Sequence, residues 1–457
     1  MSGGATRQLS ELAAGVTAGG PPAAVIDLTG LCLADFLAVA TLGARLESSE
    51  PVLRTVRALG DDGGPCTVIG RRGTATPEHA ALLNGMFAHS LDFDDTNIPA
   101  CSHPGAPVIP AVLAAAEHAG AAGPDVLSGL VAGHEVCCRV GRAIGGGAYD
   151  RGFHPTAIAG TFGAAAGAAR VLGLDAATTE SALGLAGSMA SGSMQYLCNG
   201  AWNKRLHAGL AARNGLTAAL LAASGFRGSA AAIEGDAGAL INFGTVPDPG
   251  ALTADLGRTW YLLDTGFKPY PSCRLTHAAT DICLDLHSEL GMRRADSVTV
   301  VISPRADSIV GGDAPHKVRP ANVVDAQFSV RFQCAVALLD GQVTWASYGR
   351  LDDPAVQALA ARIMVAVDPD QGPAAATVCL QTGDGVRLER HRDLPRGESG
   401  DPDNRRVVDD KLIQAATAAG WPAETLGRLR DLCQLPRTMP AARAWIPWLV
   451  AGGGDRP

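Results

Sequence analysis

The stretch RGFHPTAIAGTFGAAAGAA, residues 151–169, decides the fold class of this chain. Alanine and glycine dominate it from residue 155 onward. This composition predicts a helix over residues 155–172 that is buried on most sides, because small side chains let neighbouring helices pack closely. The stretch 207–224 has the same character and predicts a second buried helix.

Helical patterns extend outward from these stretches over residues 25–259. Thr76 followed by Pro77 is typical of an N-cap and a first helical position, and it predicts a helix over residues 77–91. Another helix is predicted over 124–143, and one short strand pair around 66–72. We therefore expect residues 1–262 to form the first part of a large all-helical domain.

The character of the sequence changes after residue 262. DSVTVVIS (296–303) alternates as a strand does, and ATVCLQT (376–382), a glycine-rich turn and VRLER predict a β-hairpin. Residues 323–339 between them are predicted to be helical. Residues 263–395 are therefore expected to form a smaller α+β lid domain, with a charged connector over 387–411. Residues 396–457, helical again from 411 to 450, are expected to complete the helical domain.

Composition excludes several classes of protein. Hydrophobic residues make up 47% of the 457 residues and charged residues 18%, which excludes a disordered chain. A net charge of −8 argues against a nucleic-acid-binding surface. Residues 181–203 carry no charge, but they contain many Ser, Gly, Asn and Gln residues, so they predict a packed interior segment and not a membrane span. Eleven scattered cysteines without a CxxC motif, and a polar N-terminus, lead us to expect a cytoplasmic protein.

Several familiar catalytic motifs are absent from this sequence or incomplete in it. No lysine follows a glycine, which excludes a Walker A loop, and HEVCC at His134 lacks the second histidine of a zinc protease helix. The run Asp92-x-Asp94-x-Thr96 fits the nucleophile motif of haloacid-dehalogenase-type phosphatases, but it follows a predicted helix and not a buried strand. This position argues against a phosphatase of that type.

Lysine is scarce in this chain. Only four of the 37 basic residues are lysines, and the other 33 are arginines. Lys204 and Lys268 fall in segments where unusual polar residues occur within apolar surroundings, whereas Lys317 and Lys411 are interpreted as ordinary surface residues. His103 and His154 lie in such segments too, and each precedes a proline, which favours an extended residue at a helix start. Imidazoles, lysines and a helix N-terminus together could bind an anion.

Five of these segments recur together in a known family. They are HSLDFDDTN (89–97), CSHPGAPVIPA (101–111), RGFHPTAIAGTFGAAAGAA (151–169), GSMASGSMQYLCNGAWNKRLHAGLAARNG (187–215) and KPYPSCRLTHAATD (268–281). The sequence resembles the MmgE/PrpD family of 2-methylcitrate dehydratases, cis-aconitate decarboxylases and iminodisuccinate epimerases. The resemblance implies a homodimer of helical and lid domains, with the site between the two domains and with no metal or organic cofactor.

The resemblance also implies site residues. Those matched to the family's catalytic positions are Asp92, His103, His154, Lys204, Lys268 and His277, and Thr96 matches its threonine. Arg274 and Tyr196 are added as substrate-binding candidates, the latter from its place in the sequence alone. Asp94 and Asp95 could belong to the site or only cap a turn. Six further histidines are interpreted as core or surface residues: His79, His118, His134, His287, His316 and His391.

The expected substrate is a small di- or tricarboxylate. A proton is removed from, or returned to, the carbon next to a carboxylate, and His103 or His154 is the candidate acid or base, oriented by Asp92. Lys204, Lys268 and Arg274 would neutralise charge in an enediolate-like transition state. His277 is expected to bind a carboxylate or relay a proton.

The expected activity is that of a cofactor-independent lyase, either a hydro-lyase of the 2-methylcitrate dehydratase type or a carboxy-lyase of the cis-aconitate decarboxylase type. NIPACS (97–102) places Ile98 near the position of a histidine often found in the family, and Phe332 stands where a tyrosine is usual. These departures argue against a specific assignment to either cis-aconitate decarboxylase or 2-methylcitrate dehydratase, and they leave the expected proton transfer intact. The alternatives are an epimerase or isomerase of an iminodisuccinate-like diacid and a catalytically silent paralogue that binds a carboxylate.

Overall fold

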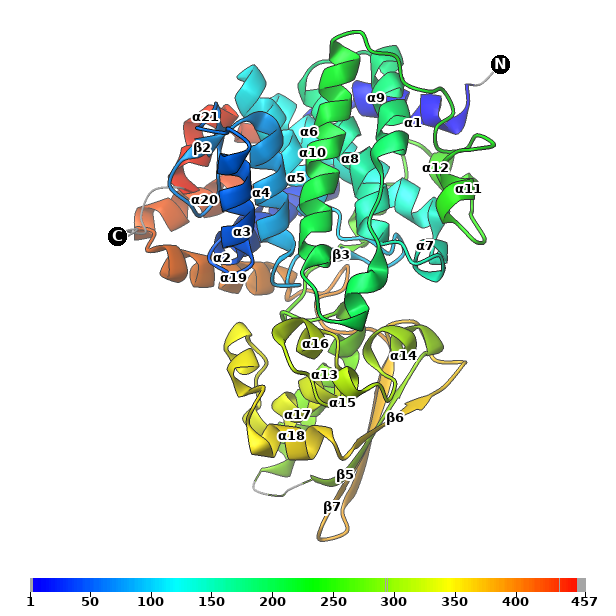
Figure 1. Cartoon of the computed structure of the whole chain (residues 1–457), viewed down its shortest axis with the longest axis vertical. Coiled ribbons are helices and arrows are strands. Elements are labelled where there is room, and N and C mark those ends of the chain that lie inside the picture. The colour runs from blue at the N-terminus through cyan, green and yellow to red at the C-terminus, as the bar shows by residue number, and fades with distance from the viewer. Residues whose placement is uncertain (1–2, 292, 294, 435, 450–457) are drawn as a thin grey trace.

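The computed structural model describes residues 3–291, 293, 295–434 and 436–449. It has a large helical lobe and a smaller lobe that contains helices and a sheet (Figure 1). The predicted fold class, mainly α with a smaller α+β part, is confirmed. Each lobe has its own apolar core, and the core of the large lobe includes C-terminal residues from Val408 to Leu449. The exact domain boundaries that the sequence suggests stay predictions.

The large lobe is built from helices that pack around the two central helices α8 and α10. Its longer helices are α1 (Ala5–Gly15), α2 (Ala23–Gly43), α3 (Ser49–Ala58), α4 (Pro77–His89), α5 (Gly105–Ala119), α6 (Gly123–Ile144), α8 (Pro155–Val171), α9 (Ala176–Met189), α10 (Asn203–Ala223), α19 (Asn404–Ala419) and α20 (Ala423–Gln434). Short helices α7 (Gly147–Asp150), α11 (Ala239–Phe243), α12 (Gly250–Thr253) and α21 (Ala442–Trp445) complete it.

Small residues explain how α8 packs against α6 and α5. A Cβ atom built at Gly163 would lie 2.6 Å from the Cβ atom of Cys137 on α6. One built at Gly167 would lie 2.7 Å from a methyl group of Val112 on α5. Since real Cβ contacts are longer than this, the helices approach closely only because these positions carry no side chain. The Ala- and Gly-rich stretch is thus a packing surface, as its composition predicts.

One helix, α2, is long and apolar enough to cross a membrane by length and composition. In the structure, 72% of its most apolar window is buried inside the protein. Its neighbours include α4 and α19, so it is packed as a core helix of the large lobe.

The small lobe has a four-stranded sheet in the order β6-β5-β7-β8, with helices packed against it. β5 pairs parallel to β6 and antiparallel to β7, and β7 and β8 form the predicted hairpin. Its strands are β5 (Ala295–Ile302), β6 (Ile363–Val367), β7 (Ala376–Thr382) and β8 (Arg387–Arg392). Its helices are α13 (His277–Leu290), α14 (Pro304–Val310), α15 (Pro315–Val318), α16 (Val323–Gln327), α17 (Val330–Asp340) and α18 (Pro354–Ala360).

Four local predictions need correction. The helix expected over 323–339 is broken between α16 and α17, because the hydroxyl of Ser329 accepts the amide of Phe332 and starts a new helix. The expected connector over 387–411 contains β8 and the first half of α19. The strand pair expected around 66–72 extends beyond that range, because β1 (Cys66–Thr67) pairs with β2 (Thr74–Ala75). Residues 190–203 are largely exposed or half-buried and not interior.

Candidate active site

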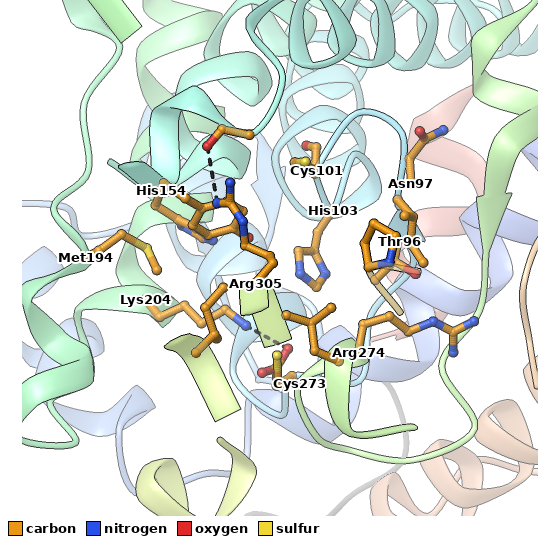
Figure 2. A pocket seen from close by; sticks show the side chains of 18 of the residues that line it. Thr96, Asn97, Cys101, His103, His154, Met194, Lys204, Cys273, Arg274 and Arg305 are labelled. Atoms are coloured by element: carbon orange, nitrogen blue, oxygen red, sulfur yellow. Dashed lines mark hydrogen bonds and ion pairs between the residues drawn. The ribbon is translucent and has the colours of Figure 1, made fainter. Parts of the chain in front are cut away.

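A cavity of about 400 Å³ lies between the two lobes. The large lobe lines it with the loop after α4, the start of α8 and the start of α10. The small lobe contributes a 3-10 helix (Arg274–Thr276), α14 and Phe328. Figure 2 shows this cavity from close by, with His103, Lys204 and Cys273 around the same space. A pocket that gathers ionisable groups from distant segments is the leading candidate for an active site.

Two short strands bring a lysine and an aspartate together. β3 (Thr96–Asn97) pairs antiparallel with β4 (Thr265–Gly266), with Thr96 opposite Gly266. The chain before β3 therefore runs beside the chain after β4, which places Lys268 next to Asp92. Asp92 has a left-handed backbone with φ +53°, an uncommon conformation for a residue with a side chain and one that is found at functional sites.

Asp92 binds two ammonium groups. Its Oδ1 atom lies 2.7 Å from Nζ of Lys204 and also accepts a hydrogen bond from Lys268. Lys268 donates a second bond, of 2.9 Å, to the carbonyl oxygen of Asp92. Lys204 lines the cavity, whereas Lys268 is fully buried and reaches Asp92 from behind. The other carboxylate oxygen of Asp92 has no hydrogen-bond partner within the described chain.

These contacts determine the charge of Asp92. Burial alone would raise the pKa of this carboxyl group. The ammonium groups of Lys204 and Lys268 outweigh burial and lower the pKa instead, with smaller help from His103 and His89. Asp92 is therefore an anion at neutral pH, and it holds the Lys204 ammonium at the cavity wall.

A second carboxylate, Asp94, lies among histidines. Nδ1 of His89 is 2.7 Å from Oδ2 of Asp94, and Nδ1 of His103 is 3.4 Å from the same atom. The rings of His89 and His103 meet edge to face with centroids 4.8 Å apart. The sequence-based expectation that Asp92 orients a histidine is wrong, because Asp94 is the carboxylate beside these rings and Asp92 binds lysines.

His103 and His154 both line the cavity. Burial lowers the pKa of His103 to about 4, although Asp94 opposes this. Burial and the neighbouring histidines also lower the pKa of His154. Nδ1 of His154 is 3.3 Å from Nδ1 of His207, so one ring donates to the other and fixes its orientation. Both cavity histidines are therefore neutral at pH 7.

His277 does not line the cavity. It is 0% exposed at the start of α13, with Nε2 3.2 Å from the carbonyl oxygen of Ser272 and Nδ1 3.2 Å from Arg274. Arg274 does line the cavity, but its guanidinium binds Glu398 and the carbonyl oxygen of Arg396. The structure thus places His277 behind the cavity wall and ties Arg274 to the chain that returns to the large lobe.

Thr96 and Tyr196 both border the cavity. The hydroxyl of Thr96 is buried and has no partner within the described chain, so it is available to a bound ligand. The hydroxyl of Tyr196 contacts the sulfur of Met194 at 3.5 Å. Tyr196, which was suggested by its place in the sequence alone, is thus found at the cavity.

Sequence reasoning missed several residues of this site. His89 lies within the quoted segment 89–97 and its ring meets that of His103, so the signal was present but was not used. Asp94, which the sequence left open between a site residue and a turn cap, lies beside both rings. His207 lies three residues after Lys204 and contacts His154. Cys273 and Arg305 are among the cavity-lining residues to which the sequence assigned no role.

The interpretation of Lys317 and Lys411 as ordinary surface residues is wrong. Lys317 donates to the carbonyl oxygens of Ile309 and Phe328, at 2.6 and 3.0 Å, and is buried. Lys411 binds Asp35 in the large lobe. All four lysines of this chain are therefore buried, so scarcity indicates burial of the ammonium group and not catalysis in particular.

Among the described residues, two groups of side chains could offer metal-ligand atoms, which lie within 4.8 Å of one another in each group. One is His89, Asp94 and His103, and the other is Cys32, Asp95 and His134. In the first group, the contact between His89 and Asp94 is already satisfied without a cation. In the second, burial raises the pKa of the Cys32 thiol, which is therefore protonated at neutral pH.

Comparison with known proteins matches both lobes. Residues 7–250 match the MmgE/PrpD N-terminal domain, and residues 270–426 match the MmgE/PrpD C-terminal domain. The chain is 29% identical over 437 residues to a cis-aconitate decarboxylase of Aspergillus terreus, covering 89% of this chain and 88% of that protein. It is 31% identical over 359 residues to the cis-aconitate decarboxylase of Homo sapiens, covering 76% of this chain and 74% of that protein.

Proposed function

We propose that this chain, a lyase that belongs to the MmgE/PrpD family, removes CO₂ from a small unsaturated polycarboxylic acid of the cis-aconitate type. The observation that carries this proposal is the Lys204–Asp92–Lys268 cluster beside two histidines in one cavity. The similarity to cis-aconitate decarboxylases over most of the chain favours decarboxylation over dehydration. The activity is proposed to need no cofactor.

The Lys204 ammonium supplies the electrostatic part of the reaction. When the bond to the departing carboxylate breaks, its electron pair moves into the neighbouring double bond and carboxylate, which gives an enediolate-like anion. An ammonium group held at the cavity wall stabilises that charge more in the transition state than in the ground state. Asp92 positions Lys204, and Lys268 keeps Asp92 ionised from the other side.

The proton that replaces CO₂ on carbon comes from His103 or His154. Both imidazoles are neutral at pH 7, since burial lowers their pKa values. A bound polycarboxylate brings negative charge next to them and raises those pKa values again, so that a histidine takes up a proton with the substrate. The balance is one proton consumed for each CO₂ released.

Epimerisation or isomerisation of a diacid is the second candidate. The observation that favours it is the low pKa of His103, about 4, because an imidazole that is neutral at pH 7 can act as a base toward a C–H bond next to a carboxylate. The same residues would then remove a proton and return it without loss of CO₂ or water.

Incubation with cis-aconitate-like, 2-methylcitrate-like and iminodisuccinate-like acids in D₂O distinguishes the candidates. We expect release of CO₂ from the first, with one deuterium bound to carbon in the product. Loss of water from the second, or deuterium exchange alone in the third, would replace decarboxylation with dehydration or epimerisation. No reaction with any acid would leave the catalytically silent paralogue.

The matched variants are His103→Ala and His118→Ala. His103 lines the cavity, whereas His118 is an exposed residue near the end of α5. We expect His103→Ala to lose at least about a hundredfold in kcat/KM and His118→Ala to keep wild-type activity. Equal activity of the two variants would remove His103 from the reaction.

We also propose that the protein works as a homodimer in the cytoplasm. All eleven cysteines are free thiols in the structure, which suits a reducing compartment. Sedimentation of the purified protein tests the dimer, and a mass of one chain would contradict it.

A further inference from the structure

The ammonium group of Lys204 is contacted from both lobes. Its Nζ atom lies 2.7 Å from Oδ1 of Asp92 in the large lobe and 4.9 Å from the centroid of the Phe328 ring in the small lobe. Phe328 and Lys204 both line the cavity. The face of an aromatic ring carries partial negative charge and attracts a cation within about 6 Å of its centroid. Phe328 therefore offers Lys204 a second attractive contact besides Asp92.

The ring of Phe328 is held in place by its neighbours. The carbonyl oxygen of Phe328 accepts a hydrogen bond of 3.0 Å from Nζ of Lys317, and the same ammonium donates to the carbonyl oxygen of Ile309 at 2.6 Å. The ring of Tyr196 meets that of Phe328 edge to face, with centroids 6.3 Å apart. Phe328 is 4% exposed, so its ring has little freedom to move away from Lys204.

The residue before Phe328 reaches the loop that carries Asp92. Gln327 is 2% exposed, and its side-chain amide donates to the carbonyl oxygen of Leu91 at 2.7 Å. Leu91 directly precedes Asp92 in the chain. Two consecutive residues of the small lobe thus contact this loop and the ammonium that it binds, so the ring and the ion pair are fixed relative to one another.

We propose that Phe328 is a positioning residue, whose ring face holds the Lys204 ammonium where the carboxylates of the substrate bind and negative charge develops. This inference rests on the proposed function, in which Lys204 stabilises that charge. A ring that only filled space could be replaced by any side chain of the same shape. A ring that holds a cation depends on the electron density of its face, so this density sets the rate.

The test changes the electron density of the ring and keeps its shape. Phe328 is replaced site-specifically by 4-fluoro-, 3,5-difluoro- and 3,4,5-trifluorophenylalanine, because fluorine withdraws charge from the face of the ring. We expect kcat/KM to fall stepwise, by about fivefold at the third fluorine and by about tenfold in Phe328→Leu. A flat series at Phe328, with turnover by the wild type, would overturn the inference and leave the ring as packing.

The matched control is the same series at Phe162. This residue is buried in the core of the large lobe and does not line the cavity. We expect kcat/KM to stay within about twofold of the wild type at this position. An equal stepwise fall at both positions would overturn the inference, because it would show a general effect of fluorine on the fold.

A second variant shows which cation the ring acts through. Nζ of Lys317 lies 5.7 Å from the centroid of the Phe328 ring, so this ammonium also responds to fluorine. In Lys204→Met, the fluorinated series should have no further effect on kcat/KM, since the cation that the ring positions is gone. A series that still falls stepwise in Lys204→Met would assign the ring to Lys317 or to packing, and it would overturn the inference.

The scarcity of lysine allows the contact to be seen directly by NMR. The chain has four lysines, so a ¹³C label at Cε gives four signals, and Lys204→Met identifies that of Lys204. Phe328→Leu should shift the Lys204 signal, because the ring current is lost. The signal of Lys411, whose Nζ lies 4.2 Å from the centroid of the Phe93 ring, should stay in place. An unchanged Lys204 signal in the folded variant would overturn the inference.

Calorimetric binding of propane-1,2,3-tricarboxylate, a saturated acid without the double bond that decarboxylation needs, separates the two proposals. If no acid is turned over but affinity falls stepwise with fluorination of Phe328, decarboxylation fails while the role of Phe328 is supported. If turnover is seen and neither kcat/KM nor affinity follows the series, the role of Phe328 fails alone. If no turnover is seen and the affinity is flat or absent, both proposals fail.

Discussion

Two buried lysine–aspartate clusters in this protein have similar chemistry and different surroundings. Lys411 and Asp35 lie 2.6 Å apart, and each is 1% exposed, within the large lobe. Lys204 and Lys268 share Asp92 at the cavity between the lobes. Lys411 also donates to the carbonyl oxygen of Phe93, next to Asp92 in sequence, so the two clusters occupy opposite sides of one loop.

The number of partners separates the two clusters. In the first, burial raises the pKa of Asp35 and lowers the pKa of Lys411 against their mutual attraction. In the second, two ammonium groups overcome burial and lower the pKa of Asp92. One carboxylate with two lysines leaves positive charge in excess, and that excess faces the cavity through Lys204. A buried ion pair alone therefore does not identify an active site, whereas an unbalanced one at a cavity presents a cation that an acidic ligand could bind.

The largest expected effect is on catalysis by Lys204→Met. We expect kcat/KM to fall about a thousandfold, because the ammonium group next to the developing charge is lost. The melting temperature should change little, since Lys268 still pairs with Asp92. Steady-state kinetics and thermal unfolding check this, and a loss of less than about tenfold in a folded variant would contradict the role of Lys204.

The corresponding change in the other cluster, Lys411→Met, should act on stability. It leaves Asp35 buried without a cation, and we expect a loss of about 3 kcal/mol in the free energy of unfolding. Activity per folded molecule should stay within about twofold, because Lys411 does not line the cavity. The double variant Asp35→Leu/Lys411→Met should recover most of the stability. A double variant as unstable as the single one would show that Lys411 acts through other contacts.

A pH effect extends the comparison to histidines. Burial lowers the pKa of His134, in the core, to about 4, the same value as for His103 in the cavity. Between pH 6.5 and 4 the unfolded chain binds a proton at His134 and the folded chain does not, so stability falls as the pH falls. The loss is about 3 kcal/mol, and it levels off below the folded pKa. Urea unfolding of wild type and His134→Gln at pH 7 and pH 4 measures it, and an equal loss in both proteins would contradict it.

The smallest effect is expected at His277. This residue is buried behind the cavity wall, although family resemblance matched it to a catalytic position. We expect His277→Gln to lower kcat/KM by less than about fivefold and to cost about 1 kcal/mol through its contacts with Ser272 and Arg274. A loss as large as that of Lys204→Met would restore His277 to the reaction.

Local signals predicted the elements that depend on near neighbours. Thr76 and Pro77 predicted the start of α4, which begins at Pro77, and alternation predicted β5. Strand β6 was missed because its pairing with β5 joins residues more than 60 positions apart, with no turn between them to signal it. The break between α16 and α17 was missed because one serine side chain decides it.

The candidate site residues also divide into those that a local motif could identify and those that depend on tertiary contacts. Motif resemblance selected Asp92, His103, His154 and Lys204, and the structure gathers all four at one cavity. It could not assign Asp94 to the histidines, since both aspartates lie in one segment and only the turn at Asp92 decides which carboxylate faces which ring. Cys273 borders the cavity and His277 does not, because the 3-10 helix between them turns the chain inward.

The sequence by itself determined a mainly helical protein with a smaller α+β part and a small set of residues able to bind an acid and move a proton. These properties could be predicted because helix packing depends on local composition and because short motifs identify the catalytic residue types. Only the tertiary structure decided which carboxylate pairs with which cation and which buried lysine faces the cavity between the lobes. Those properties depend on contacts between segments that are distant in the sequence, because burial and charge balance exist only once these segments have come together.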